Sequence, residues 1–193
     1  MPPVRPLSRR PPRRALSGHT NYRKRLKLVK SGKPRLVVRR SNKYLTVQLV
    51  ESRRGGDYTA VTVTTKMLSK YGWQGGGKNI PAAYLAGLLA GKKATSKGYG
   101  EAIVDLGMHA PHPGSRLFAA VRGALDAGLK ITSDKEMLPS EDRIAGKHVS
   151  DYYNASKESG ESFVFSALPP AILENLPQHV EEVKQKIITN SSV

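Results

Sequence analysis

Basic residues dominate the first quarter of the sequence, and the chemistry they suggest is anion binding. The chain has 193 residues, with 32 Lys plus Arg, 15 Asp plus Glu and a net charge of +17. Residues 1–44 hold 15 of the Lys and Arg and no acid, because the first carboxylate is Glu51. The rest of the chain carries 17 basic and 15 acidic groups, an ordinary balanced surface. A charge concentrated in this way indicates a polyanionic partner, either nucleic acid or an anionic membrane surface.

The residues between these cations favour RNA over lipid. Tyr22, Tyr44, Asn21 and Asn42 are interleaved with them. Aromatic rings stack on unpaired bases, and amides bond base edges and 2′-hydroxyls, which a lipid surface does not offer. We therefore predict RNA binding and no membrane partner. The cations stand on an arm, a helix, a turn and a hairpin, in this order: Arg9, Arg10, Arg13 and Arg14; Arg23, Lys24, Arg25, Lys27 and Lys30; Lys33 and Arg35; Arg39, Arg40 and Lys43.

A glycine-rich segment at residues 72–78 has the spacing G-x-x-x-x-G-K of a nucleotide phosphate loop. Such a loop follows a buried strand and ends in Ser or Thr, which holds magnesium. Here residues 66–71 have the pattern of a polar helical turn, and Asn79 stands at the magnesium position. The context favours a plain glycine loop before a helix, with Lys78 available to a phosphate. A nucleotide-dependent enzyme that uses this loop is the alternative function.

A second group of polar residues, Asp105, His109, His112 and Ser115, follows a predicted strand, where α/β sheets often place ligands. A catalytic triad or a metal site are the possibilities. However, prolines at 111 and 113 prevent a helix from bringing both imidazoles to one face, and the chain has no Cys. We interpret the segment as a polar loop, and we expect no catalytic residue, no metal and no cofactor.

The elements that must position the basic residues begin with an arm and a short helix. Residues 1–18 combine five prolines with five arginines, so we expect an extended arm. The spacing of Tyr22, Leu26 and Val29 then predicts a helix that is capped at Thr20 or Asn21. We expect its apolar face to dock on the protein core and its basic face to point outward.

The middle of the chain has the pattern of an α/β domain. Residues 34–41, 43–52 and 57–65 predict a three-strand antiparallel meander, because they are rich in Val, Tyr and Thr and are separated by turn signals. A small-residue helix at 80–98, a strand at 101–107 and an amphipathic helix at 114–129 follow. The helix at 80–98 is long enough for a crossover, so the fourth strand should be parallel to a neighbour. The fold class is therefore α/β, with a mixed sheet covered by helices in two or three layers.

The last part of the chain is more polar and predicts peripheral helices at about 140–153 and 170–188. We divide the chain into a basic arm (1–18), an α/β RNA-binding core (19–132) and a helical extension (133–193). The absence of Cys excludes a disulfide-stapled domain. The longest apolar run, residues 80–91, is too short to span a membrane, and the N-terminus lacks the hydrophobic run of a signal peptide, so we expect a cytoplasmic protein.

Four strings resemble one family in the same order. They are TNYRKRLKLVKSGKPRLVVRRSNKYLTVQLV at 20–50, YGW at 71–73, IPAAYLAGLLAGKKA at 80–94 and DLGMHAPHPGSRLFAAVRGALDAGL at 105–129. They are similar to the archaeal and eukaryotic form of the universal eighteenth protein of the large ribosomal subunit. The tail after residue 133 lacks the very basic C-terminal run of eukaryotic relatives, so the archaeal type fits better.

This resemblance implies a non-enzymatic ribosomal protein that binds 5S rRNA and helps attach it in the central protuberance. The implied partners are 5S rRNA, 23S-type rRNA, the universal fifth large-subunit protein and other proteins of the protuberance, in the large subunit of the cytoplasmic ribosome. The family's RNA contacts carry over by position to Asn21, Tyr22, Arg25, Lys33, Arg35, Arg39, Ser41, Asn42 and Lys43. A generic adaptor that binds polyanions is the further alternative.

Overall fold

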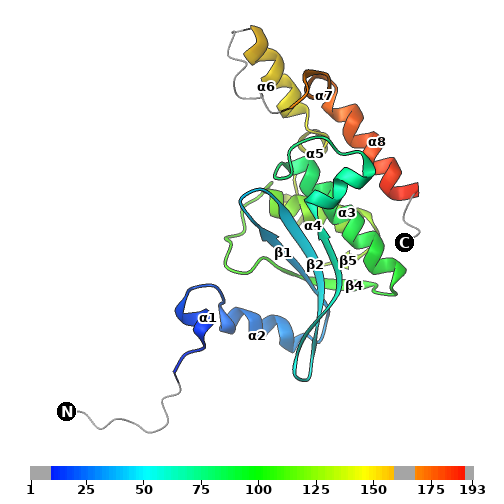
Figure 1. Cartoon of the computed structure of the whole chain (residues 1–193). Coiled ribbons are helices and arrows are strands. Elements are labelled where there is room, and N and C mark those ends of the chain that lie inside the picture. Colours follow the sequence, from blue (N-terminus) through cyan, green and yellow to red (C-terminus); the bar gives the residue numbers. More distant parts are fainter. Residues whose placement is uncertain (1–9, 159–167, 190–193) are drawn as a thin grey trace, which may run out of the picture.

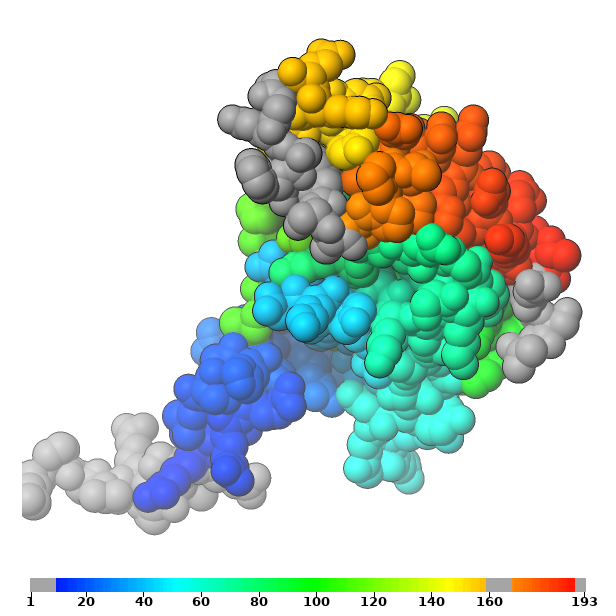
Figure 2. Space-filling model, turned by 45° about the horizontal axis from the view of Figure 1, so that its top comes forward, coloured from blue at the N-terminus to red at the C-terminus, as the bar shows by residue number. Residues whose placement is uncertain are grey.

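The computed structural model describes residues 10–158 and 168–189 and is built on one mixed sheet (Figure 1). The strands are β1 (Arg35–Arg40), β2 (Leu45–Arg53), β3 (Gly56–Thr64), β4 (Glu101–Asp105) and β5 (Lys130–Ile131), in the spatial order β3-β2-β1-β4-β5. The N-terminal and C-terminal helices lie at opposite ends of the molecule (Figures 1 and 2). The predicted α/β class with a mixed sheet is therefore confirmed.

The pairing of the four predicted strands and its direction also agree with the prediction. β1 pairs antiparallel with β2, and β2 pairs antiparallel with β3, which forms the expected meander. β4 pairs parallel with β1 after the crossover, with Arg35 opposite Ile103. β5 was not predicted, because two residues are too few to show a periodic pattern. Its pairing with β4 is also parallel.

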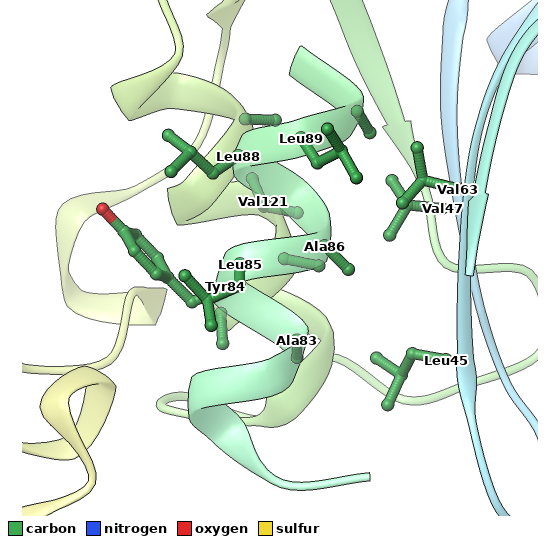
Figure 3. Packing of buried hydrophobic residues seen from close by; sticks show 14 of the residues in the cluster. Leu45, Val47, Val63, Ala83, Tyr84, Leu85, Ala86, Leu88, Leu89 and Val121 are labelled. Atoms are coloured by element: carbon green, nitrogen blue, oxygen red, sulfur yellow. The ribbon is translucent and has the colours of Figure 1, made fainter. Parts of the chain in front are cut away.

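Two helices cover one face of the sheet and form the core. They are α3 (Ile80–Ser96) and α4 (Arg116–Asp126). Figure 3 shows Ala83, Ala86 and Leu89 of α3 directed toward Val47 and Val63 of the sheet. The remainder of α3 packs on α4 so closely that a Cβ atom at Gly87 would collide with the carbonyl group of Ala120. The small side chains of α3 thus allow a two-layer arrangement with an almost fully buried helix.

The opposite face of the sheet is crossed by two short helices, α1 (Arg13–Leu16) and α2 (Tyr22–Lys30). Among residues 10–18, therefore, the chain makes a helical turn where the sequence predicted an extended arm, because Arg14 Nε donates to Thr20 Oγ1 at 3.0 Å and backbone bonds close the turn. The α2 helix and its Asn21 cap are confirmed, since Asn21 Oδ1 accepts from the Lys24 amide at 3.0 Å.

The prediction that the apolar face of α2 docks on the core is wrong. Leu26 is 55% exposed and Tyr22 is 38% exposed, and no residue of α2 is buried. The helix is connected to the sheet by polar contacts instead, through the ion pair of Arg25 with Asp57 and the bond from Lys24 to the Gly107 carbonyl. An apolar stripe in the sequence shows which face of a helix is hydrophobic, and not whether that face is covered.

The C-terminal helices are α5 (Glu141–Ala145), α6 (Lys147–Glu158), α7 (Pro170–Glu174) and α8 (Leu176–Thr189). The single helix predicted at 140–153 is interrupted at Gly146, which has a left-handed φ of 82°. The helix predicted at 170–188 is likewise divided at Asn175. Leu176, Val180 and Val183 of α8 are buried against the core, so this extension is packed firmly.

A 3₁₀ helix (Thr65–Tyr71) ends the meander, as the pattern of a helical turn indicated, and a second one (Lys135–Met137) precedes α5. Over the ranges 10–158 and 168–189, no helix has both the length and the apolar character needed to cross a membrane.

Candidate nucleic-acid interface

A chain of ion pairs joins α2 to the outer face of the sheet. Arg25 of α2 and Arg35 of β1 both bond Asp57 of β3, at 2.8 and 2.6 Å. Arg35 also bonds Asp105 of β4 at 2.9 Å, and Arg39 bonds the other oxygen of that carboxylate at 2.9 Å. We name this series of five side chains, in the order Arg25, Asp57, Arg35, Asp105 and Arg39, the arginine–aspartate ladder.

The centre of the ladder is buried and therefore shielded from water. Arg35 is 4% exposed and Asp105 is 5% exposed. Burial alone would raise the pKa of Asp105. However, the hydrogen bond and charge of Arg39 hold that pKa below its usual range, together with hydrogen bonds from the Gly107 backbone amide and from Arg35. The pKa of Asp57 is lowered in the same way, since the bond and charge of Arg35 outweigh the effect of burial. Both carboxylates therefore stay ionised.

This burial changes the role that fits Arg35. The sequence predicts a contact between Arg35 and RNA, but both of its terminal nitrogens are engaged with carboxylates inside the protein. A phosphate could reach it only by displacing Asp57 or Asp105. We therefore assign Arg35 to positioning the cations around it, above all Arg25 and Arg39, whose side chains remain 38% and 41% exposed.

A polar cleft of about 340 Å³ lies between the N-terminal helices and the sheet. Its walls include Arg14, Lys24, Arg25, Arg35 and Arg39. Lys24 Nζ donates to the Gly107 carbonyl at 3.3 Å and holds the first turn of α2 near the end of β4. The cations of the cleft come from α1, α2 and β1, and the two carboxylates within it are neutralised by the ladder. The arrangement suits a phosphate-bearing ligand.

Other predicted cations have no carboxylate in reach among residues 10–158 and 168–189. Their side chains are exposed and their charge is available to a partner. Arg10 lies just before α1, Arg13 and Arg14 lie on α1, and α2 carries Arg23, Lys27 and Lys30. Arg9 lies outside the described residues. Lys33 bonds Glu101 at 2.7 Å, but both side chains are about half exposed, so this pair costs little to break.

The remaining predicted residues lie in the connection between β1 and β2. Ser41 Oγ accepts from the Tyr44 amide at 3.1 Å and donates to the Tyr44 carbonyl at 2.9 Å, which closes a tight turn. Asn42 and Lys43 are exposed at its tip. Because the six residues of β1 separate this turn from Lys33, the two groups lie roughly 20 Å apart. The predicted set thus forms an extended surface and not one pocket.

The glycine-rich segment at 72–78 does not form a phosphate cradle. It follows a 3₁₀ helix and not a strand, and Trp73 Nε1 donates to the Gly76 carbonyl at 3.4 Å across its interior. Thr65 Oγ1 donates to the Gly77 carbonyl at 2.6 Å, and Asn79 caps α3 through the Ala82 amide at 2.9 Å. The loop is a packed connection to α3, as the context in the sequence favoured.

The second polar group is also divided. Asp105 belongs to the ladder, whereas His109, His112 and Ser115 line a separate cleft with Arg40. No three side chains of the types His, Cys, Asp and Glu come together for a metal in the part of the chain that the structure describes. Burial, with the charges of Arg40 and Arg39, lowers the pKa of His109. This imidazole is therefore neutral at pH 7.

Sequence reasoning missed two residues of this surface. Asp57 was taken only as the start of a predicted strand after a turn, although it holds both Arg25 and Arg35 in place. Its one signal is that it is the second carboxylate in the chain after a long basic stretch. Arg40 was counted among the cations but left out of the contacts implied by the resemblance; it is exposed at the end of β1.

Comparisons with known proteins agree with one another. A family model described as "Ribosomal large subunit proteins 60S L5, and 50S L18" matches residues 9–100. Large ribosomal subunit protein uL18 of Aeropyrum pernix is 46% identical over 191 residues, which cover 94% of this chain and 88% of the relative. The uL18 protein of Thermofilum pendens is 46% identical over 92% of this chain and 93% of its own length. That of Caldivirga maquilingensis is 45% identical over 91% and 88%.

Proposed function

The chain belongs to the uL18 family of large ribosomal subunit proteins, and from that premise we propose that it binds 5S rRNA and helps attach it in the central protuberance. Family membership makes the protein a structural component of the ribosome, with rRNA as its partner, and not an enzyme. Its relatives among the archaea agree with the archaeal type that the C-terminal tail suggested.

The observation that supports the proposed RNA contact most directly is the outer face of the sheet. There the ladder fixes Arg25 and Arg39, and Arg14 of α1 and Lys24 of α2 line the same polar cleft. An A-form RNA helix is recognised mostly by its phosphates and 2′-hydroxyls, and loops by their bases. In the proposed complex the basic faces of α1 and α2 neutralise phosphates, while Asn42 and Lys43 contact RNA at the far end of β1.

The C-terminal extension supports a different role. Residues 133–193 carry 10 acidic and 6 basic groups, so they repel a polyanion. We assign rRNA contacts to the arm (1–18) and the core (19–132), and contacts with neighbouring ribosomal proteins to the extension (133–193). The universal fifth large-subunit protein is the neighbour proposed beside the 5S rRNA.

A salt-titrated binding assay with 5S rRNA tests the proposal, with tRNA as competitor. About eight phosphate contacts would give a slope of log affinity against log salt of roughly −6 to −7. Binding that tRNA displaces as easily as 5S rRNA itself would contradict the proposal and leave a generic polyanion binder. Deletion of residues 1–44 is unsuitable here, because it removes β1 from the centre of the sheet.

Substitution of unpaired cations locates the site without that damage. The triple variant Arg23→Ala, Lys27→Ala, Lys30→Ala should reduce the magnitude of the salt slope by about 2 to 3, because each lost phosphate contact contributes about 0.7 to 0.9. The matched control carries Lys135→Ala, Lys147→Ala and Lys186→Ala, which are equally exposed but lie in the extension. An equal change in both variants would show that the surface is assigned wrongly.

A further inference from the structure

The α2 helix separates two clefts of opposite character. The polar cleft lies on one side of the ion pair between Arg25 and Asp57, and a second cleft of about 470 Å³ lies on the other side. Both residues of the pair line both clefts. The second cleft runs between α2 and the hairpin of β2 and β3, which project from the same end of the molecule (Figures 1 and 2).

The wall that α2 gives to the second cleft is apolar. Tyr22, Leu26 and Val29 line it, one turn of helix apart. Ser52, Arg53, Gly56 and Asp57 of the hairpin form the facing wall. We name this space the apolar cleft. It contains the very side chains that were expected to pack on the core, and its volume lies within the range of small-ligand sites, about 300 to 1,000 Å³.

Exposure of these side chains is unfavourable in the free protein. Tyr22 and Leu26 are among the most exposed large apolar residues of the described chain, at 38% and 55%. Grouped apolar surface of this kind, with a polar rim, is typical of a site that a partner covers. Tyr22 is exposed, so its hydroxyl is accessible to the edge of a ligand.

The charges around the apolar cleft indicate the class of ligand. Arg25 stands at its border, and Arg23, Lys27 and Lys30 lie on the same short helix. The nearby carboxylates are neutralised, since Asp57 is bonded by two arginines and Glu51 bonds Arg53 at 2.9 Å. A partner that enters here must combine an apolar, flat part with negative charge, which describes a nucleotide of a bound RNA.

We propose that the apolar cleft receives one unpaired base of the bound RNA, whose own phosphate or a neighbouring one lies against Arg25. This inference rests on the proposed RNA-binding function and adds to it a base-specific subsite. The base stacks against Tyr22 and covers Leu26 and Val29, as unstacked bases do on aromatic platforms. The ion pair between Arg25 and Asp57 then forms the partition between a phosphate side and a base side of the same helix.

The experiment blocks the cleft without changing its charge. Val29→Trp fills the space that the base would occupy, while Ile188→Trp makes the same kind of change on α8, at a residue that is 38% exposed and does not line the cleft. Affinity for 5S rRNA is measured for both variants and the unchanged protein over a series of salt concentrations. Val29→Trp should weaken binding about tenfold, the scale of one stacked base, with an unchanged salt slope. Ile188→Trp should stay within about twofold.

A second readout comes from the RNA itself. Chemical probing of unpaired bases should find one base that the unchanged protein protects and Val29→Trp does not. If Val29→Trp fails to fold by circular dichroism, Leu26→Ser replaces it, because Leu26 is 55% exposed and supports no packing. Wild-type affinity together with an unchanged probing pattern in the variant would overturn the proposal and leave the cleft to a protein partner. Failure of the unchanged protein to prefer 5S rRNA over tRNA would instead overturn the proposed function, and the base subsite with it.

Discussion

The two groups of appended helices are attached to the sheet domain by opposite means. The C-terminal helix α8 buries Val183 and Ile187 completely and stacks His179 on Trp73 with ring centroids 5.3 Å apart. The N-terminal helix α2 buries no residue and is held by the ion pair of Arg25 with Asp57 and a lysine contact to a carbonyl group. The C-terminal helices extend the hydrophobic core, whereas the N-terminal helices are attached by polar contacts.

This difference separates stability from binding. Apolar burial involves no charges that salt could screen or pH could titrate, and the packed side chains fix the position of the helix. Exposed ion pairs contribute little to stability and can be exchanged for contacts with a partner. The molecule thus keeps its cations on the loosely attached helices, where RNA can use them, and its acidic surplus on the firmly packed ones.

The largest expected effect comes from the centre of the ladder. Asp105→Ala leaves Arg35 buried with one carboxylate partner where it had two, so we expect the free energy of unfolding to fall by about 3 to 5 kcal/mol. Urea denaturation measures it. Glu101→Ala is the control on the same strand: its pair with Lys33 is exposed, so the loss should be at most about 0.5 kcal/mol. Similar losses in both variants would show that the ladder is no firmer than a surface pair.

The next effect tests the apolar attachment of α8 against the polar attachment of α2. Ile187→Ala removes a fully buried side chain and should cost about 2 to 3 kcal/mol in unfolding free energy. Leu26→Ala, in the corresponding experiment on α2, should change it by less than about 0.5 kcal/mol, because this side chain is already 55% exposed. A large loss from Leu26→Ala would mean that α2 packs more tightly than its exposure indicates.

Charge reversal should affect RNA affinity in the opposite order, with the larger loss from α2 and the smaller one from α8. Arg25→Glu is expected to weaken 5S rRNA binding about tenfold or more, roughly 1.4 kcal/mol, because it replaces a phosphate contact with repulsion. Lys186→Glu on α8 should leave affinity within about twofold, since the extension is assigned no RNA contact. Filter binding at two salt concentrations measures both. Equal losses would remove the distinction between the two ends.

The smallest expected effect is that of mild acid. The pKa values of Asp57 and Asp105 are lower in the folded protein than in the unfolded chain, so their contribution to stability is fully present above the unfolded value of about 4 and is lost as the pH falls through the folded values. Unfolding free energy should therefore change little from pH 7 to about 5 and then decline. In Asp57→Asn the decline should be shallower. An equally steep decline would assign it to other carboxylates.

The sequence was sufficient for elements whose pattern is local. The three strands of the meander, α3 and α4 followed from β-branched runs and helical spacing, and the parallel pairing of β4 followed from the length of the crossover. The breaks at Gly146 and Asn175 were missed, because a glycine or asparagine within a polar helix is ambiguous without its φ angle.

For the candidate site, the sequence identifies the cations but does not show which of them are bonded to carboxylates within the protein. A run of Lys and Arg does not show that Arg35 faces two carboxylates from strands that lie 22 and 70 residues away. Nor does an apolar stripe show that Leu26 is left uncovered. Both facts depend on tertiary distances, which a pattern of nearest neighbours does not contain.

The pairing of Arg35 with Asp105 also sets an order of events during synthesis. The cationic helices leave the translating ribosome first, but the carboxylate that completes their support is made 70 residues later, with β4. Until then β1 lacks its parallel neighbour, and Arg35 has no second carboxylate. The nascent N-terminus is consequently a highly charged segment without a fixed position, in surroundings rich in nucleic acid. The support of Arg35 is therefore complete only when slightly more than half of the chain has emerged.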